Sequence, residues 1–468
     1  MAFDTGPRIT ATGDERPTAV VVAVQLPDVT EGELSSSMAE LERLAKTLGL
    51  DPVGRVTQRR AKLAPGLVFG EGKLVELASW TGGTGVIEAY SKPGAKKKDD
   101  YADEDEADEP DPNDTPATPP AEKPPARATV VLVDHDLSPT QQRNLERATG
   151  ADVLDRTSVI LEIFHRHAKT REARLQVEIA RLKYLAPRLR ESSDSGDRVR
   201  GGVGGKGAGE SSLELDRRRI RDRIAELRNE LSQIEGGSKV RRDRRSELPT
   251  VALVGYTNAG KSSLMRALTS TDVYIADKLF ATLDTTVRRL QPPTDPPILI
   301  TDTVGFIKKL PHDLVASFRS TLDEAGDADL LLHVVDAADE ALSEQVAVTR
   351  DVLAEIGADK VPTWFVLNKI DRVDEAGRAA LKERYPDALQ LSAKAREDVA
   401  ELRDKLIEHF SGKLEEAELE VPWSHQKVAH LIHERTTVLA EEHGDTGTSF
   451  KVKAPARVLD ALREALRN

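Results

Sequence analysis

The sequence predicts a multidomain α/β protein whose central domain carries a mostly parallel sheet. The chain of 468 residues suffices for two to four domains, because a single hydrophobic core rarely serves more than about 300 residues. Short apolar runs alternate with helical patterns along the first third of the chain, which is typical of a parallel sheet. Further along, the pattern G-x-x-x-x-G-K-S stands between an apolar run and a helical one, which indicates a phosphate-binding loop joining a strand to a helix.

The first domain is expected to span residues 1–168 and to be a small α/β unit. Strand-like runs such as AVVVAVQL, GVIEAY and TVVLVD alternate with helical patterns such as ELSSSMAELERLAKTLG. Residues 92–128 interrupt this alternation with Pro, Asp and Glu and almost no apolar side chains. Such a segment cannot bury enough surface to offset its ordering entropy. We therefore expect a disordered insertion, which serves as a solvated spacer or, alternatively, as an acidic segment that binds a partner by mimicking nucleic acid.

The net charge of −13 is concentrated in this insertion. Residues 99–114 hold ten acidic side chains and no basic one, so basic clusters elsewhere can still contact phosphates. The sequence has no cysteine, which excludes disulfides, thiol catalysis and cysteine-based metal sites. The apolar runs are shorter than the roughly 20 residues of a membrane span, and no leader-like segment opens the sequence. We therefore expect a soluble, cytoplasmic protein without a membrane span.

Residues 169–247 are expected to form an arm of two antiparallel helices with a basic linker. Apolar residues recur at steps of three and four from Leu175 to Leu189 and again from Ile220 to Ile234, which predicts one apolar stripe on each helix. Residues 198–209 between them are basic and carry six glycines. This glycine-rich tip is longer than a helix hairpin requires, and it serves either as a plain linker or as an RNA contact. The candidate contacts are Arg198, Arg200, Gly202, Lys206 and Gly207.

The central domain, expected over residues 248–412, begins with the P-loop pattern. Its small residues allow backbone N–H groups and a helix N-terminus to face phosphate. Lys261 is expected to reach the β- and γ-phosphates, and Ser262 to ligate Mg²⁺. Asn258 either stabilises the turn or ligates a monovalent cation such as K⁺ beside the phosphates. The predicted loop comprises Gly255, Tyr256, Thr257, Asn258, Ala259, Gly260, Lys261 and Ser262.

Three further motifs follow in the order that a GTPase requires, and each ends an apolar run. In ILITDTVG, Asp302 is expected to hold Mg²⁺ through water, and the N–H of Gly305 to meet the γ-phosphate. In WFVLNKID, Asp371 is expected to accept hydrogen bonds from guanine N1–H and the exocyclic amine, a pattern that adenine lacks. The S-A-K of LQLSAKA is expected to support the base. The predicted nucleotide contacts here are Asp302, Thr303, Val304, Gly305, Asn368, Lys369, Ile370, Asp371, Ser392, Ala393 and Lys394.

Two positions near these motifs bear on hydrolysis. LFATLDTT offers Thr282, Thr285 and Thr286 as the hydroxyl that completes Mg²⁺ coordination, and spacing alone does not choose between them. Phe306 follows the D-x-x-G motif directly, where many GTPases carry a glutamine that orients water. Because an apolar side chain cannot orient water, we expect slow hydrolysis until a partner orders the switch segments.

Residues 413–468 are expected to form a small C-terminal α/β domain. The segment beginning at ELEVPW reads as a strand and a helix, and TSFKVKAPARVLDALREAL reads as a second strand and helix. The complete prediction is an α/β multidomain chain: a small α/β domain, a two-helix antiparallel arm, a P-loop GTPase domain with a mostly parallel sheet, and a small C-terminal α/β domain.

Taken together, these residues resemble the HflX family of ribosome-associated, translation-factor-related GTPases. The likeness covers nearly all of the chain except its extreme N-terminus and the acidic insertion. It rests on long stretches that are much more specific than a P-loop. They include DHDLSPTQQRNLE at 134–146, GGVGGKGAGESSLELDRR at 201–218, LFATLD at 279–284 and DTVGFIKKLPHDLVASFRSTLDEA at 302–325.

The resemblance implies roles that the residues alone leave open. It assigns the Mg²⁺-binding switch hydroxyl to Thr282, within the nucleotide-contacting stretch of Phe280, Ala281, Thr282, Leu283 and Asp284. It implies GTP-dependent binding of a monomer to the large ribosomal subunit, with the glycine-rich tip directed toward the peptidyl-transferase RNA. Hydrolysis would be stimulated by ribosomes, and the function would be to split or rescue stalled ribosomes. The alternative is a GTPase switch for ribosome assembly or RNA modification that acts through a protein partner, with the arm as a dimerisation hairpin.

Overall fold

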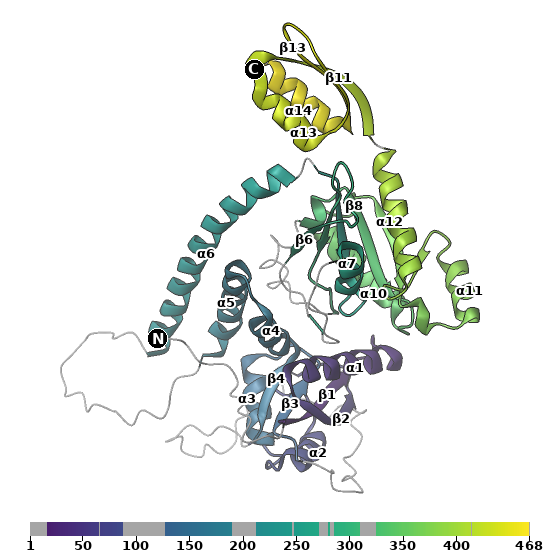
Figure 1. Cartoon of the computed structure of the whole chain (residues 1–468). Coiled ribbons are helices and arrows are strands. Elements are labelled where there is room, and N and C mark those ends of the chain that lie inside the picture. The colour runs from purple at the N-terminus through teal and green to yellow at the C-terminus, as the bar shows by residue number, and fades with distance from the viewer. Residues whose placement is uncertain are drawn as a thin grey trace, which may run out of the picture. The chain divides into compact units, whose positions relative to one another are not determined.

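A computed structural model of the chain describes residues 16–64, 66–87, 127–189, 212–245, 248–270, 279–280, 285–308, 324–412 and 414–467. The chain forms two compact units (Figure 1). The first unit comprises Met1–Arg166 with Ala180–Ile224, and the second comprises His167–Ile179 with Ala225–Asn468. Most of the predicted insertion, the glycine-rich tip and the switch stretch 281–284 lie outside the described residues, and the four-domain division remains a prediction.

The first unit contains a four-stranded parallel sheet in the order β2-β1-β3-β4. One face of this sheet packs against α2 and α3 through a cluster of buried aliphatic side chains that includes Val20, Val22 and Leu77. The predicted small parallel α/β domain is therefore present. Its elements are β1 Thr18–Gln25, α1 Glu31–Leu48, β2 Asp51–Arg59, α2 Glu71–Thr81, β3 Val130–Val133, α3 Pro139–Thr149, β4 Asp152–Asp155 and α4 Arg156–His167.

Capping residues mark the helix ends in this unit. Thr30 and Glu33 form a reciprocal capping box at the start of α1, in which Thr30 Oγ1 accepts from Glu33 N at 3.2 Å. Ser138 and Gln141 form the same arrangement at the start of α3. A glycine with left-handed backbone ends each of α1, α2 and α3, where a side chain would be strained.

Two details of the first unit differ from the sequence prediction. Residues 85–87 of the strand-like run GVIEAY are not in a strand, and the sheet instead gains β2 from DPVGRVTQR, which pairs with β1. The insertion also ends earlier than predicted. Ala128 is buried in the core and donates its N–H to Trp80 O at 2.8 Å, so its position is fixed by packing.

A buried ion-pair network links three elements of the first unit. Arg156, at the start of α4, is 1% exposed and pairs with Asp134 at 2.7 Å and with Glu40 of α1. Asp134 also accepts a hydrogen bond from Ser37 Oγ at 2.6 Å. One buried guanidinium thus pairs with both carboxylates, as buried polar groups require.

The two predicted arm helices are α5 Arg171–Leu185 and α6 Ser212–Arg245. A short 3-10 turn, Ala186–Arg188, follows α5. Both predicted apolar stripes contain buried members, among them Leu175, Leu182 and Leu227. The C-terminal end of α5 is fixed within the first unit because Tyr184 donates its hydroxyl to Asp155 at 2.8 Å. Burial raises the pKa of that carboxyl, and hydrogen bonds from Ser158 and Tyr184 oppose the rise.

The second unit contains a six-stranded sheet in the order β10-β9-β8-β5-β7-β6. All neighbours pair in parallel except β6, which is antiparallel to β7. One face packs against α7 and α12, and the other packs against α10. The strand directions confirm the predicted mostly parallel sheet. The elements are β5 Thr250–Val254, α7 Lys261–Thr269, β6 Thr286–Arg289, β7 Leu299–Asp302, β8 Leu330–Asp336, α10 Leu342–Glu355, β9 Thr363–Asn368, α11 Glu375–Arg384, β10 Leu389–Gln390 and α12 Arg396–Ser411.

The chain ends in a three-stranded antiparallel sheet with two helices packed against it. The elements are β11 Leu414–Pro422, α13 Gln426–Arg435, β12 Thr437–His443, β13 Gly447–Pro455 and α14 Ala456–Arg467. The prediction of strand, helix, strand and helix missed β12, which forms a hairpin with β13. Across the described residues, no helix combines the length and the hydropathy needed to cross a bilayer.

Candidate functional site

The P-loop leaves β5 at the carboxyl edge of the sheet and enters α7. Gly255 has φ of 142°, and a Cβ there would lie 2.1 Å from Val334 O. Gly260 has φ of 96°, and a Cβ there would lie 2.2 Å from Asn368 Nδ2. Only glycine fits either position, because a side chain would clash and would also require a left-handed backbone. The two glycines thus allow the loop to curl closely over the strand ends.

Lys261, the first residue of α7, is buried beneath this loop. Its Nζ donates to Gly255 O and to Tyr256 O, each at 2.9 Å. Burial lowers the pKa of Lys261 to about 8, and the charge of Asp302 opposes this shift. The ammonium is therefore held in a fixed position inside the loop and is costly to keep charged without an anion beside it.

Ser262 and Asp302 come together from the P-loop and from the end of β7. Ser262 Oγ donates to Asp302 Oδ2 at 2.7 Å. A hydroxyl and a carboxylate are hard oxygen ligands of the kind that Mg²⁺ takes, and Mg²⁺ commonly uses only one or two protein carboxylates together with substrate phosphates. The donor set therefore fits Mg²⁺. Within the described ranges no group of three or more His, Cys, Asp or Glu side chains gathers into a separate metal site.

The D-x-x-G segment after β7 lies against the P-loop. Thr303 Oγ1 donates to Leu253 O at 2.7 Å, which ties this segment to β5. The side chain of Phe306 is 1% exposed and packs in the core with Val254 and Leu331. From the sequence, Phe306 stands at the position where many GTPases orient water. In the structure its side chain is part of the hydrophobic core of the domain.

The N-K-x-D segment donates two side-chain hydrogen bonds to backbone carbonyls of the P-loop. Asn368 Nδ2 donates to Ala259 O at 2.8 Å, and Asn368 Oδ1 accepts from Ala393 N at 3.0 Å. Lys369 has φ of 60°, and its Nζ donates to Asn258 O at 2.6 Å and to Asp336 at 2.7 Å. Asn368 and Lys369 thus connect the P-loop, β8 and the S-A-K loop.

Asp371 is exposed at this edge and is oriented by the S-A-K loop. Ser392 Oγ donates to Asp371 Oδ1 at 2.6 Å, and this hydrogen bond is the main reason that the pKa of Asp371 is lowered. Ser392 N in turn donates to Asp398 at 2.7 Å. The carboxylate of Asp371 therefore stays ionised and can accept two hydrogen bonds from a base. Sequence reasoning missed Asp336 and Asp398, because nothing in the motifs points to these more distant partners.

The remaining predicted residues divide between described and undescribed parts of the chain. Phe280 is buried and has φ of 56°, while Ala281, Thr282, Leu283 and Asp284 lie outside the described residues. Thr285 and Thr286 are described, with Thr286 opening β6. Asn258 is exposed and has φ of 62°, a left-handed conformation that asparagine tolerates well, so its turn-forming role has direct support. The five candidate RNA contacts of the tip also lie outside the described residues.

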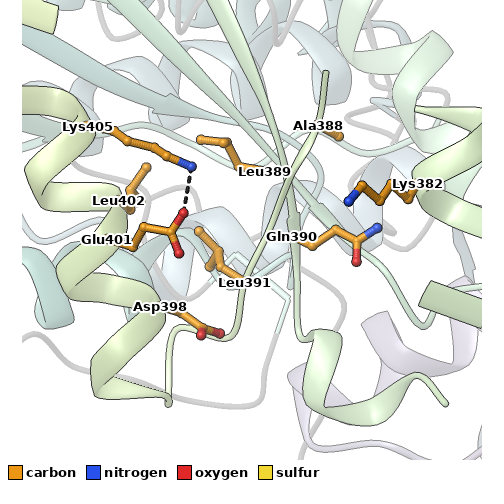
Figure 2. A pocket seen from close by; sticks show the side chains of 9 residues that line it. All are labelled: Lys382, Ala388, Leu389, Gln390, Leu391, Asp398, Glu401, Leu402 and Lys405. Atoms are coloured by element: carbon orange, nitrogen blue, oxygen red, sulfur yellow. Dashed lines mark ion pairs between the residues drawn. The ribbon is translucent and has the colours of Figure 1, made fainter. Parts of the chain in front are cut away.

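Figure 2 shows a pocket beside the S-A-K loop, at the free edge of the sheet. Its volume is about 190 Å³, and it lies between α11 and α12 over the edge strand β10. Lys405 and Glu401 of α12 form an ion pair of 2.7 Å at its side. The residues that line the pocket include Leu391, which precedes Ser392, and Asp398, which accepts a hydrogen bond from Ser392 N. The lining thus positions Ser392, and we do not assign the pocket to the nucleotide.

Comparison with known proteins places the chain in a family. Family models match residues 35–87 and 122–165 as a GTP-binding GTPase N-terminal region, residues 167–245 as a GTP-binding GTPase middle region, and residues 250–369 as a 50S ribosome-binding GTPase. The GTPase HflX of Gluconacetobacter diazotrophicus is 56% identical over 454 residues, which are 96% of this chain and 98% of the relative. The GTPase HflX of Escherichia coli K12 is 37% identical over 431 residues, which are 91% of each chain.

A solved structure is also similar. The GTP-binding protein from the hyperthermophilic archaeon Sulfolobus solfataricus, in complex with GDP, is 22% identical with a TM-score of 0.41, covering 84% of this chain and 98% of that one. The two sequence relatives match along almost the whole chain, at 56% and 37% identity. Together with the GTPase domain at residues 250–369, they show that this chain belongs to the HflX family and is a GTPase.

Proposed function

We propose that the protein is a cytoplasmic, GTP-driven factor that binds the large ribosomal subunit as a monomer and splits or rescues stalled ribosomes. Membership of the HflX family supports this proposal, as does the description of the model matching residues 250–369 as a 50S ribosome-binding GTPase. The structural observation that carries it is a row of exposed arginines at the start of α6.

This arginine row comprises five exposed side chains within two turns of helix. In the sequence, residues 210–216 separate them from the basic, glycine-rich tip of residues 198–209. Arg219 has a local ion pair with Asp216 at 2.9 Å, and both side chains are substantially exposed, so the pair contributes little to stability. Exposed guanidinium groups at this density are suited to phosphate contacts along RNA. The row consists of Arg217, Arg218, Arg219, Arg221 and Arg223.

The nucleotide site would drive this binding. In the proposal, Gly255 to Ser262 would hold the phosphates, Ser262 and Thr282 would ligate Mg²⁺, and Asp302 would hold the ion through water. Asp371 would read guanine. Mg²⁺ would neutralise charge that develops on the phosphates. The protein groups supply positioning: Lys261 is fixed by two carbonyls and Asp371 by Ser392. Asn258 is the candidate ligand for K⁺, at the exposed rim of the loop.

The test measures binding of the full chain to purified large subunits by co-sedimentation, with a non-hydrolysable GTP analogue and with GDP. We expect binding only with the analogue, and strong stimulation of GTP turnover by the subunits. The triple substitution Arg217→Glu, Arg218→Glu and Arg221→Glu should abolish binding without changing nucleotide affinity. Deletion of residues 199–209 should have the same effect.

A matched control makes the same charge change on α11, where Arg378, Lys382 and Arg384 are exposed. Their replacement by Glu should preserve binding. If both triple variants bind equally weakly, the attraction is non-specific and the arginine row is not the contact. If the subunits neither bind nor stimulate the protein, the ribosomal function is wrong. A GTP-dependent dimer without RNA affinity in analytical ultracentrifugation would then favour the protein-partner alternative.

A further inference from the structure

Asp398, in the first turn of α12, supports the S-A-K loop although it lies outside the four nucleotide motifs. Its Oδ2 accepts a hydrogen bond from Ser392 N at 2.7 Å. The helix holds this carboxylate in place, because Val399 and Leu402 are buried in the core of the domain. Figure 2 shows Asp398 and Leu391, the residue before Ser392, among the side chains that line one pocket. The carboxylate is thus a fixed acceptor for the backbone of Ser392.

Ser392 connects this acceptor to the carboxylate that is assigned to the base. It is 3% exposed, and its two donors reach two different residues. Its N–H donates to Asp398, and its Oγ donates to Asp371 Oδ1 at 2.6 Å. Lys394 N donates to the same Oγ at 3.3 Å. Because the hydroxyl has a single hydrogen and donates it to Asp371, the position of the Ser392 backbone determines where Asp371 Oδ1 is held.

Asp371 depends on this hydrogen bond for its orientation. Its side chain is exposed, and the hydrogen bond from Ser392 is the main cause of its lowered pKa. Guanine presents two donors to such a carboxylate, N1–H and the exocyclic amine, whereas hypoxanthine presents N1–H alone. Two parallel hydrogen bonds require a fixed carboxylate plane, while a single one tolerates rotation. A loosely held Asp371 should therefore lose more affinity for guanine than for hypoxanthine.

We propose that Asp398 is a positioning residue for guanine recognition. It holds Ser392 N, the Ser392 hydroxyl then aligns Asp371, and Asp371 meets both donors of the base. Asp398 acts through Ser392 and does not touch the nucleotide. The inference rests on the proposed reading of guanine by Asp371, and it places a determinant of base specificity in α12, outside the motifs that contact the nucleotide.

The experiment measures equilibrium dissociation constants of the full-length protein, in Mg²⁺, for GDP and for IDP, the inosine nucleotide that lacks the exocyclic amine. The wild type should prefer GDP. In Asp398→Ala the ratio of the two affinities should fall about fivefold, the factor that one net hydrogen bond contributes. Asp398→Asn should keep most of the ratio, since its amide oxygen can still accept from Ser392 N. In a Ser392→Ala background, Asp398→Ala should cause no further fall, because the hydroxyl through which it acts is already absent.

Glu401→Ala is the matched control, because Glu401 lies one turn further along α12, lines the same pocket and pairs with Lys405 at 2.7 Å. It should leave the ratio unchanged. Equal weakening of GDP and IDP by Asp398→Ala would show a merely structural role and overturn the proposal. An unchanged ratio, an equal fall in Asp398→Asn, or a further fall in the Ser392→Ala background would also overturn it. A wild type that binds GDP and IDP equally would refute the reading of guanine by Asp371 itself, and with it this proposal. Ribosome binding enters none of these measurements, so its failure is separable.

Discussion

The buried His333 should make the P-loop GTPase domain less stable in acid. It lies in the central strand β8, opposite Val254 of β5 and Phe365 of β9, and it is 3% exposed. Its ring meets the Phe365 ring edge-on at 5.2 Å, and Nε2 has no hydrogen-bond partner among the described residues. The pKa of His333 is lowered from 6.5 to about 3, mainly by burial and in smaller part by the positive charges of Arg350 and Lys261.

The sign of the effect follows from proton binding. Below pH 6.5 His333 becomes protonated in the unfolded chain, whereas in the folded chain it stays neutral down to about pH 3. Protonation therefore favours unfolding, and stability falls by about 1.4 kcal/mol per pH unit over this window. Between pH 7.5 and pH 5.0, His333 alone should remove about 2 kcal/mol of the free energy of unfolding. His333→Leu keeps an apolar side chain in the strand and removes this titration.

The assay is urea unfolding at pH 7.5 and at pH 5.0, followed by the fluorescence of Trp364 in a Trp80→Phe, Trp423→Phe background. Trp364 lies in β9, opposite Leu332 of β8, so the signal reports this domain. We expect the loss of stability on acidification to be about 2 kcal/mol smaller in His333→Leu than in its parent. His430→Leu, at an exposed position of α13, should behave like the parent. Equal losses in parent and His333→Leu would refute the reasoning.

Three further predictions follow from the remaining contacts. Asp371→Asn should shift base preference from guanine toward xanthine, because the amide can donate where the carboxylate accepted; competition binding with GDP and XDP measures this, and retained guanine preference would contradict the assigned role. Arg156→Met should destabilise the first unit by about 3–5 kcal/mol, since it removes the cation that pairs with the buried carboxylates of Asp134 and Glu40; thermal unfolding measures this, and a loss below 1 kcal/mol would contradict the assigned role of the ion pairs. Asn258→Ala should remove any acceleration of GTP turnover by KCl over NaCl if its side chain ligates a cation; undiminished potassium acceleration would leave Asn258 only its role in the turn.

The positions of the P-loop and of the N-K-x-D and S-A-K loops could be predicted from sequence because each is a short contiguous motif at the end of an apolar strand. The geometry of the P-loop follows from Gly255 and Gly260, whose positions admit no side chain. The partners that orient these motifs are spread along the chain and carry no local signal. Asp398 supports Ser392, and Asp336 pairs with Lys369, only because strands and helices far apart in sequence meet at one edge.

The missed strands have a different cause. In β2, DPVGRVTQR, only Val56 is fully buried, so the segment lacks the clear apolar alternation that predicts a strand. In β12, TVLAEEH follows α13 without a glycine or proline, and its side chains are mostly exposed. Both strands are specified by pairing with a neighbour, β1 or β13, which is tertiary information.

Phe306→Gln tests whether the side chain at position 306 can act in hydrolysis, as its place after the D-x-x-G motif indicates, or serves only in the hydrophobic core. A glutamine here restores the residue type that orients water in many GTPases. Phe306, however, is 1% exposed and packs against Val254 and Leu331. A buried amide in this cluster would lose the aromatic packing and leave polar atoms without partners, at a cost of about 3 kcal/mol or more.

Phe306→Leu is the control, because it removes part of the packing without adding a polar group. We expect both variants to hydrolyse GTP at similar single-turnover rates, and the glutamine variant to be the less stable in urea. The backbone hydrogen bonds from Thr257 N to residue 306 O and from residue 306 N to Gly255 O are independent of the side chain, so both variants retain the bridge to the P-loop. Hydrolysis accelerated tenfold in Phe306→Gln alone, with no loss of stability, would mean that the side chain at 306 reaches the phosphates and that its core packing is not required.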